Sequence, residues 1–249
     1  MTYSKDRYAG PSSEWSIYHG FIPQSTNSPS YHRNFPTTGA NNLYFDLLIV
    51  NSSPLNWGDP ITQGGITVTM TPDVTGETVR VTLTGPVAKP EQLVVNPSKQ
   101  VDKPTLPQTF ELVGRDNSGQ AVVKYGFELK QWFFNGGEKG FGFSTIGQVC
   151  NGNGYRYPIF ADLTNAVSGS SIGATPSSPG NHYQRRIGAG LFTEWGAVST
   201  YVGANFVHAY SDESGGYGAG GRSMKVNPED GRIRGLPHYY GVYLVCAYP

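Results

Sequence analysis

The sequence predicts a protein built mainly from β-strands, with an α+β part toward the C-terminus. Of the 249 residues, 33 are Gly and 18 are Pro, which excludes a helical bundle because both residues weaken helices. Aromatic residues make up 13%, and since they bury large areas the chain is not expected to be disordered. Short runs that alternate apolar and polar residues recur in the first half, which is the pattern of half-buried strands.

The first half contains a clear hairpin signal. Residues 1–35 show no sustained period, and we expect loops with one short strand there. The run 41–51, NNLYFDLLIVN, predicts a buried strand. The runs 66–70 (ITVTM) and 79–83 (VRVTL) alternate around a turn that contains Gly, which predicts two paired strands.

A second hairpin is predicted by the runs 109–115 and 121–134, which flank the turn residues Asp-Asn-Ser-Gly. The stretch between the two hairpins, 88–107, holds several prolines and no period, and we expect a long connection or an edge. Short strands at this spacing favour an immunoglobulin-like β-sandwich over residues 1–130.

The second half has a different character. Residues 135–158 are irregular, and helical spacing follows at 159–166, directly after Pro158, and at 190–201. Asp230 and Gly231 predict a hairpin turn. Strands are predicted at 206–210, 223–226, 232–233 and 239–247.

The charge pattern narrows the possible functions. The chain has 18 Lys and Arg against 18 Asp and Glu, and charged residues are only 14% of it. A nucleic-acid partner is not expected, because such binding needs a basic surplus. No apolar run is long enough to span a bilayer, and the first residues lack the apolar core of a secretory signal. Two interpretations remain, a cytosolic protein or a piece of a longer exported chain.

The sequence offers little for catalysis or for a cofactor. The five histidines form no spaced zinc motif, and no Gly-x-Ser-x-Gly elbow supplies a nucleophile. The best acidic cluster joins Asp212 and Glu213 with Glu229 and Asp230. That set is thin for calcium, which needs six to eight oxygen ligands, so we expect solvated loop acids. We predict no enzyme activity, no metal site and no cofactor.

Two cysteines, Cys150 and Cys246, leave two alternatives open at this stage. They are buried free thiols, or they form a disulfide that would stabilise the fold by roughly 4–5 kcal/mol on the chain-entropy model. A disulfide would place the protein in an oxidising compartment.

Several motifs together resemble the C-terminal part of the intimin/invasin family of bacterial outer-membrane adhesins. They are KQWFF at 130–134, CNGNGYRYP at 150–158, ADLTNA at 161–166, TEWG at 193–196 and the closing strand with Cys246. The resemblance covers most of the chain and is strongest over 121–249. It implies an immunoglobulin-like domain over 1–130, a C-type-lectin-like domain over 131–249 and a disulfide between Cys150 and Cys246.

The resemblance also implies a location and a class of partner. The chain would be the distal tip of a bacterial surface protein, attached to the outer membrane only through an N-terminal barrel region that this sequence does not contain. Its partner would be a host-cell receptor, or an extracellular-matrix or glycan ligand. The Glu-Pro-Asn and Trp-Asn-Asp motifs of calcium-dependent sugar-binding lectins are absent, so we expect metal-free binding. Formylglycine-generating enzymes share a lectin-like core, but their closely spaced cysteines are missing here.

Two loops are the candidate binding surface, because loops on a rigid scaffold commonly carry function. The candidate ligand-binding residues are Tyr, Arg, His and Asp side chains in the loops 168–186 and 212–222: His182, Tyr183, Arg185, Arg186, Asp212, Tyr217 and Arg222. The structural alternative is that Arg185 and Arg186 pair with Glu194 while Tyr183 packs beneath them. At the level of function, the alternative to an adhesin is a structural spacer or self-association module.

Overall fold

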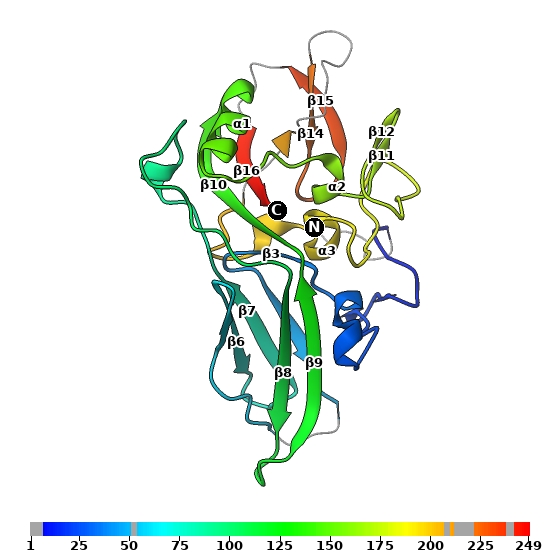
Figure 1. Cartoon of the computed structure of the whole chain (residues 1–249). Coiled ribbons are helices and arrows are strands. Elements are labelled where there is room, and N and C mark those ends of the chain that lie inside the picture. The colour runs from blue at the N-terminus through cyan, green and yellow to red at the C-terminus, as the bar shows by residue number, and fades with distance from the viewer. Residues whose placement is uncertain (1–6, 51–53, 207–209, 212–221, 238–241) are drawn as a thin grey trace.

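The computed structural model describes residues 7–50, 54–206, 210–211, 222–237 and 242–249. The molecule is elongated, with most of the helices at one end and the long strand hairpins at the other (Figure 1). We call residues 7–42 the N-terminal arm, residues 43–130 the hairpin half and residues 131–249 the disulfide half. The fold is mainly β, as the sequence predicts.

The hairpin half contains two sheets that face each other across a core. One sheet has the strand order β4-β7-β6-β5, and the other is the pair β8-β9. All neighbouring strands are antiparallel. The strands are β4 (Tyr44–Leu48), β5 (Ile61–Gln63), β6 (Ile66–Pro72), β7 (Thr78–Thr84), β8 (Gln108–Arg115) and β9 (Ala121–Leu129). A short 3₁₀ helix, Pro90–Gln92, lies in the connection between β7 and β8.

Both predicted hairpins are confirmed. In β6 the alternating residues Ile66, Val68 and Met70 are buried, because successive side chains of a strand point to opposite faces. The predicted strand 121–134 is wrong in one respect: it is two strands, β9 and β10 (Gln131–Phe141), which belong to different sheets. The backbone N–H of Lys130, between them, donates to the carbonyl of Thr37 in the arm at 2.7 Å.

Strand β4 corrects the prediction of a fully buried strand at 41–51. It lies at the edge of its sheet and pairs only with β7 in the described part of the chain. Phe45 and Leu47 pack against the core, whereas Asp46 and Leu48 are exposed. An apolar run alone does not distinguish a central strand from an edge strand beside a cavity.

The disulfide half is built around a sheet in which β10 lies between β16 (Val242–Tyr248) and β3 (Thr38–Ala40). The β10–β16 pair is antiparallel, and the β10–β3 pair is parallel. The smaller strands are β11 (Val167–Ser168), β12 (Ser171–Ile172), β13 (Tyr210–Ser211), β14 (Arg222–Val226) and β15 (Ile233–Pro237). Gly231, with φ of +70°, is in the turn between β14 and β15 and bears out the predicted hairpin turn.

The disulfide between Cys150 and Cys246 is present and joins helix α1 (Phe143–Gly152) to β16. Helix α1 was not predicted, because the sequence of 135–158 looks irregular. Its buried residues, Ile146, Val149 and Cys150, pack in a core cluster with Leu244. Tertiary packing and the covalent bond therefore stabilise a helix that has two glycines and no side-chain N-cap.

The two predicted helices are shorter than expected. The first is α2 (Phe160–Leu163). The second, expected over 190–201, is α3 (Leu191–Trp195) followed by a 3₁₀ turn at Val198–Thr200. Gly196 separates them with φ of +76°, a backbone conformation that favours glycine, and the guanidinium of Arg185 occupies the space where a Cβ would lie.

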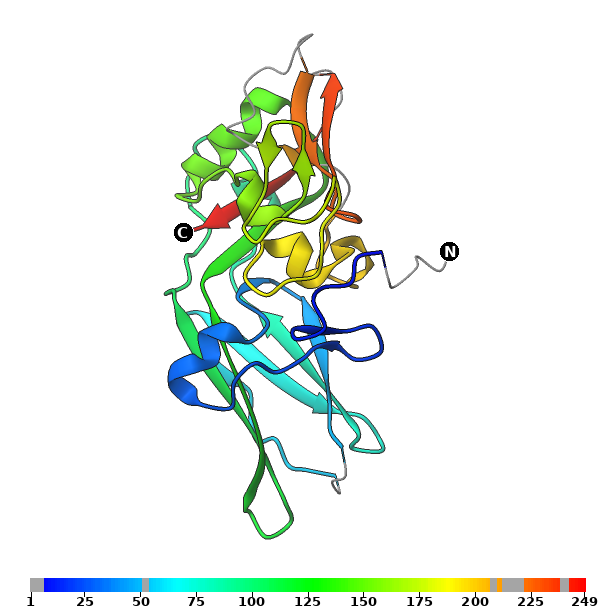
Figure 2. The same cartoon turned by 90° about the vertical axis from the view of Figure 1, so that its right-hand side faces the viewer.

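The N-terminal arm connects the two halves. It contains β1 (Trp15–Ser16), β2 (Gly20–Phe21), a 3₁₀ helix (Ser28–Arg33) and β3, and it runs along one side of the molecule (Figure 2). Tyr31 of the 3₁₀ helix packs against Gly126 of β9, while β3 pairs with β10. One hydrophobic cluster extends through both halves, so the arm is part of the shared core.

Candidate binding site

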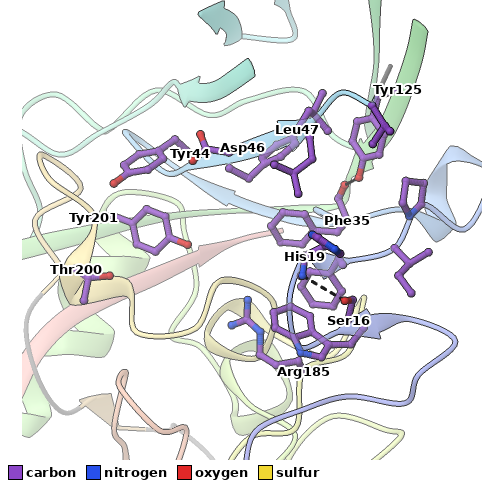
Figure 3. A pocket seen from close by; sticks show the side chains of 18 residues that line it. Ser16, His19, Phe35, Tyr44, Asp46, Leu47, Tyr125, Arg185, Thr200 and Tyr201 are labelled. Carbon is purple, nitrogen blue, oxygen red and sulfur yellow. Dashed lines mark hydrogen bonds between the residues drawn. The ribbon is translucent and has the colours of Figure 1, made fainter. Parts of the chain in front are cut away.

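A large cavity lies where the N-terminal arm, strand β4 and the 3₁₀ turn 198–200 meet. Its volume is about 840 Å³, within the range of pockets that hold small ligands or peptide side chains. It opens to solvent, and the labelled side chains in Figure 3 surround it. The lining residues are Trp15, Ser16, His19, Gly20, Phe21, Ile22, Pro23, Phe35, Tyr44, Phe45, Asp46, Leu47, Leu48, Val50, Tyr125, Arg185, Thr200 and Tyr201.

Aromatic rings form most of the cavity wall. Phe21 and Phe35 stack with their ring centroids 4.7 Å apart, and Phe45 meets Phe35 edge-on at 5.3 Å. On the other side, Tyr44 and Tyr201 meet edge-on at 5.0 Å. These rings come from the arm, β4 and the disulfide half. The wall therefore exists only when the three segments are folded together.

Arg185 places one positive charge against this wall. Its guanidinium carbon lies 4.6 Å from the centroid of the Trp15 ring and 5.3 Å from that of Phe21, in the geometry of a cation–π contact. Burial lowers the pKa of Arg185, while the nearby Tyr183, Tyr201 and Glu194 groups oppose that shift. The guanidinium stays charged, because arginine is not deprotonated in proteins.

Behind the wall, Glu194 fixes the arm to α3. The backbone N–H groups of Thr37, Thr38 and Gly188 donate to its carboxylate at 2.9 to 3.1 Å, and both threonine hydroxyls donate as well. Burial raises the pKa of Glu194, and these hydrogen bonds oppose the shift. The carboxylate is fully buried and thus determines where the arm enters the core.

The acidic side chain in the cavity wall is already neutralised. Arg80 donates to both carboxylate oxygens of Asp46, at 2.9 and 3.0 Å, and its guanidinium lies 4.1 Å from the Tyr44 ring centroid. Ser16 and His19 both line the cavity, but it is the backbone N–H of His19 that donates to the Ser16 hydroxyl. That contact does not activate the hydroxyl as a nucleophile, which requires the imidazole ring.

Four of the candidate residues from the first loop lie close to the arm. The ring of His182 meets Tyr8 edge-on at 5.6 Å, and Tyr183 is buried against the same ring at 4.9 Å. Arg186 pairs with Glu14 at 3.1 Å. Of the four, only Arg185 lines the cavity. A ligand-binding role for the other three stays a prediction.

The structural alternative for this loop is partly right. Tyr183 does pack in the core, where burial raises its pKa to about 12. Arg186, however, pairs with Glu14 and not with Glu194. Glu194 is instead occupied by donors from the arm and from Gly188.

Most of the second candidate loop, 212–222, lies outside the residues that the structure describes. Asp212 and Tyr217 lie outside the described residues, and Arg222 is the first residue of β14. Of the acidic cluster, Glu229 and Asp230 are described, and Asp230 faces Arg232 at 3.5 Å. No group of three or more potential metal ligands occurs among the residues that the structure describes. No helix in that same part of the chain is long and apolar enough to cross a membrane.

Sequence reasoning missed most of the cavity. Trp15, Phe21, Tyr44 and Tyr201 are separated by up to 186 positions in the sequence, and no local period connects them. A usable signal was the density of aromatic residues in a first segment without regular structure. Aromatic side chains there need partners to cover them, and both halves supply them: Arg185 covers Trp15, whereas Phe45 packs on Phe35.

Comparison with known proteins supports the fold and leaves the family open. The architecture is mainly β, with a disulfide between helix α1 and the last strand. A similar solved structure is the crystal structure of invasin, described as a bacterial integrin-binding protein, with a TM-score of 0.55 and 16% sequence identity. The match covers 91% of this chain and 38% of the invasin chain. At this identity the likeness shows the fold alone.

No protein-family model matches the sequence. No curated protein matches it either. The chain spans well under half of the length of the invasin chain that it matches.

Proposed function

We propose that this chain is the ligand-binding part of a bacterial surface adhesin, which holds a host-cell receptor without a calcium ion. The observation that carries the proposal is the open aromatic cavity at the junction of the arm and the two halves. The invasin-like fold over 91% of the chain supports it, because the structure of invasin is that of an integrin-binding protein.

The location of the protein is part of the same proposal. A disulfide between Cys150 and Cys246 suits an oxidising compartment such as the cell exterior. The nearly neutral chain, with many aromatic residues, suits contact with another surface more than binding to nucleic acid. We therefore place the chain on the bacterial surface and propose a receptor protein or glycan as its partner.

We also infer that the chain divides near residue 130 into an immunoglobulin-like and a lectin-like domain. Strand β9 ends at Leu129 and β10 begins at Gln131 in a different sheet, which supports this boundary. Limited proteolysis tests it: cleavage near residue 130 that leaves two stable fragments is expected. Fragments that unfold once they are separated would contradict the boundary. That result would mean that the arm, which contacts both halves, joins them into one folding unit.

Beads coated with the purified chain test the adhesin function. They should adhere to cultured host cells, and adherence should survive EDTA because no calcium is required. Loss of adherence on chelation would contradict metal-free binding. Beads that clump without attaching to cells would instead support self-association, the alternative function.

A further inference from the structure

Strand β4 presents to the cavity a hydrogen-bonding edge that pairs with no strand in the described part of the chain. The N–H of Ile49 donates to the carbonyl of Glu77, and the N–H of Leu83 donates to the carbonyl of Leu43, both at 2.8 Å. These two bonds fix the register, with every second residue of the strand bonded to β7. The backbone N–H and C=O groups of the odd-numbered residues of β4, Phe45 and Leu47, therefore face β7.

The even-numbered residues of β4 point their backbone groups the other way. By this register the N–H and C=O groups of Tyr44, Asp46 and Leu48 face away from β7, and no strand in the described part of the chain pairs with them. All five residues of β4 line the cavity. A row of unpaired backbone groups at a sheet edge is a template for another strand.

A second, independent observation lies across the cavity. Two buried side-chain nitrogens, Nε1 of Trp15 and Nε of Arg185, have no hydrogen-bond partner in the part of the chain that the structure describes. Both residues line the cavity. Buried polar groups are nearly always hydrogen-bonded, so these two donors leave this part of the cavity wall short of acceptors.

The charges around the cavity indicate the nature of that ligand. Asp46 is neutralised by Arg80, whereas Arg185 forms no ion pair with a carboxylate among the described residues and stacks on Trp15. The net charge of the wall is therefore positive at Arg185. A guanidinium in an aromatic, partly desolvated site favours a carboxylate, which it can bind with two parallel hydrogen bonds.

We propose that the cavity receives an extended peptide segment of a partner protein, which adds to the free edge of β4 and sets an acidic side chain against Arg185. The inference rests on the proposed function, since it specifies the partner of the same adhesin. Peptide addition to a sheet edge is an established recognition mode, in which backbone bonds give affinity and side-chain pockets give specificity.

A peptide satisfies the site better than a sugar or a second copy of this chain. Only a peptide backbone supplies alternating donors and acceptors that match the β4 edge. The rim of the cavity is aliphatic, with Leu48 and Val50 exposed, which suits apolar peptide side chains more than sugar hydroxyls. A symmetric dimer would bring two Arg185 side chains to one interface without a carboxylate to neutralise them.

Selection from random peptides tests the proposal directly. A phage-displayed library of linear dodecapeptides is panned on the intact chain. The expected result is enrichment of sequences with an Asp or Glu at a constant distance from an aromatic or aliphatic residue. Enriched peptides without a common acidic position would overturn the role of Arg185.

A backbone scan of one selected peptide then tests strand addition. Single N-methyl groups are introduced along the synthetic peptide. Methylation at alternate positions should weaken binding by about tenfold or more, because it removes a bond to the β4 edge, while the intervening positions tolerate it. Equal effects at all positions, or none, would contradict addition to β4.

Two matched variants of the protein complete the test. Leu48→Asp adds a negative charge to the rim and should weaken binding of the acidic peptide by about tenfold. Val122→Asp, at a β9 position with the same 51% exposure, should leave binding unchanged. Arg185→Leu should abolish the preference for an acidic peptide over its Asn or Gln version, with folding checked by thermal melting.

The outcomes separate this inference from the adhesin function. Beads that adhere to host cells while no peptide binds would overturn the inference and leave the adhesin proposal standing. Peptides that bind at β4 while the beads do not adhere would support the peptide site and contradict the adhesin function. A dimer in solution that Leu48→Asp converts to monomer would show a second copy at the groove and overturn the peptide proposal. Binding of a uronic acid by a chain that selects no peptide would favour a glycan ligand and would also overturn the peptide proposal.

Discussion

The hairpin half and the disulfide half are stabilised by contacts of different range. In the hairpin half, β6 pairs with β7 and β8 with β9, and each pair is joined by a short turn. In the disulfide half, Trp132 lies opposite Tyr248 in the β10–β16 pair, and the disulfide joins residues 96 positions apart. Pairing between neighbouring strands can be recognised in a sequence from its local pattern. Closure of a long loop costs entropy, and the disulfide and the long-range strand pair that offset this cost leave no local pattern.

Removal of the disulfide is the change with the largest expected effect. Replacing Cys150 and Cys246 together with Ser should destabilise the disulfide half by roughly 4–5 kcal/mol, because the unfolded chain regains the freedom of a loop of nearly a hundred residues. The hairpin half has no such bond, and β8 and β9 should melt close to their original temperature. Amide hydrogen exchange, measured as the temperature rises, distinguishes the unfolding of the two halves.

The same experiment has a simple control. Reductant should lower the melting temperature of the unmodified chain and leave the double variant unchanged. Uniform destabilisation of both halves would contradict the contrast between them and would mean that they unfold as one unit.

Loss of the Glu194 carboxylate is expected to be the next largest effect. Glu194→Ala removes the acceptor for the buried donors of Thr37, Thr38 and Gly188, which should cost about 3 kcal/mol. Chemical denaturation measures it. Glu138→Ala, an exposed site in the same half, is the control and should change little. Glu194→Ala should also open the cavity, since Glu194 holds the arm that carries Trp15 and Phe21.

Contact between the halves is tested by Gly85, which follows β7. A Cβ at this position would lie 2.6 Å from the Trp132 ring, so Gly85→Ala should destabilise the protein by about 1–3 kcal/mol through overpacking. Gly140→Ala is the matched control, because nothing lies within 4 Å of its added Cβ. Equal stability of the two variants would mean that Trp132 moves freely and that the junction is loosely packed.

These contacts also explain how much the sequence could predict. The alternation of Ile66, Val68 and Met70 reports strand geometry residue by residue, and both hairpins followed from such patterns. The disulfide could be expected only from the resemblance of the surrounding motifs to a known family. Helix α1 could not be predicted, because Gly147 and Gly152 hide its helical spacing and its stability comes from β16.

The candidate site was the hardest part to predict. The sequence indicates Arg185 as a binding residue because Arg is common in binding sites, but its contacts with Trp15 and Phe21 depend on how the arm folds back. The sequence predicts a binding surface on exposed loops, and that stays a prediction. The aromatic cavity lies at a junction of three segments, and a junction leaves no periodic signal in any one of them.

The smallest expected effect concerns acid sensitivity and again separates the halves. In β8 the carboxylate of Glu111 accepts hydrogen bonds from Lys124 and from the Tyr31 hydroxyl, and these contacts hold its pKa below the ordinary value of 4.5. Because the folded-state pKa is depressed, this stabilisation is present above the ordinary value and is lost as the pH falls through the folded pKa. The side chain is about one-third exposed, so screening keeps the contribution below about 1 kcal/mol.

Glu111→Gln should therefore make unfolding of the hairpin half less sensitive to pH below about 4.5, with a small loss of stability at neutral pH. Denaturation midpoints measured from neutral pH into the acid range give both quantities. Glu138→Gln, exposed in the disulfide half, should leave the profile unchanged. If both variants flatten the profile equally, the acid response belongs to the net charge of the molecule and not to the contact that joins Tyr31 of the arm to β8.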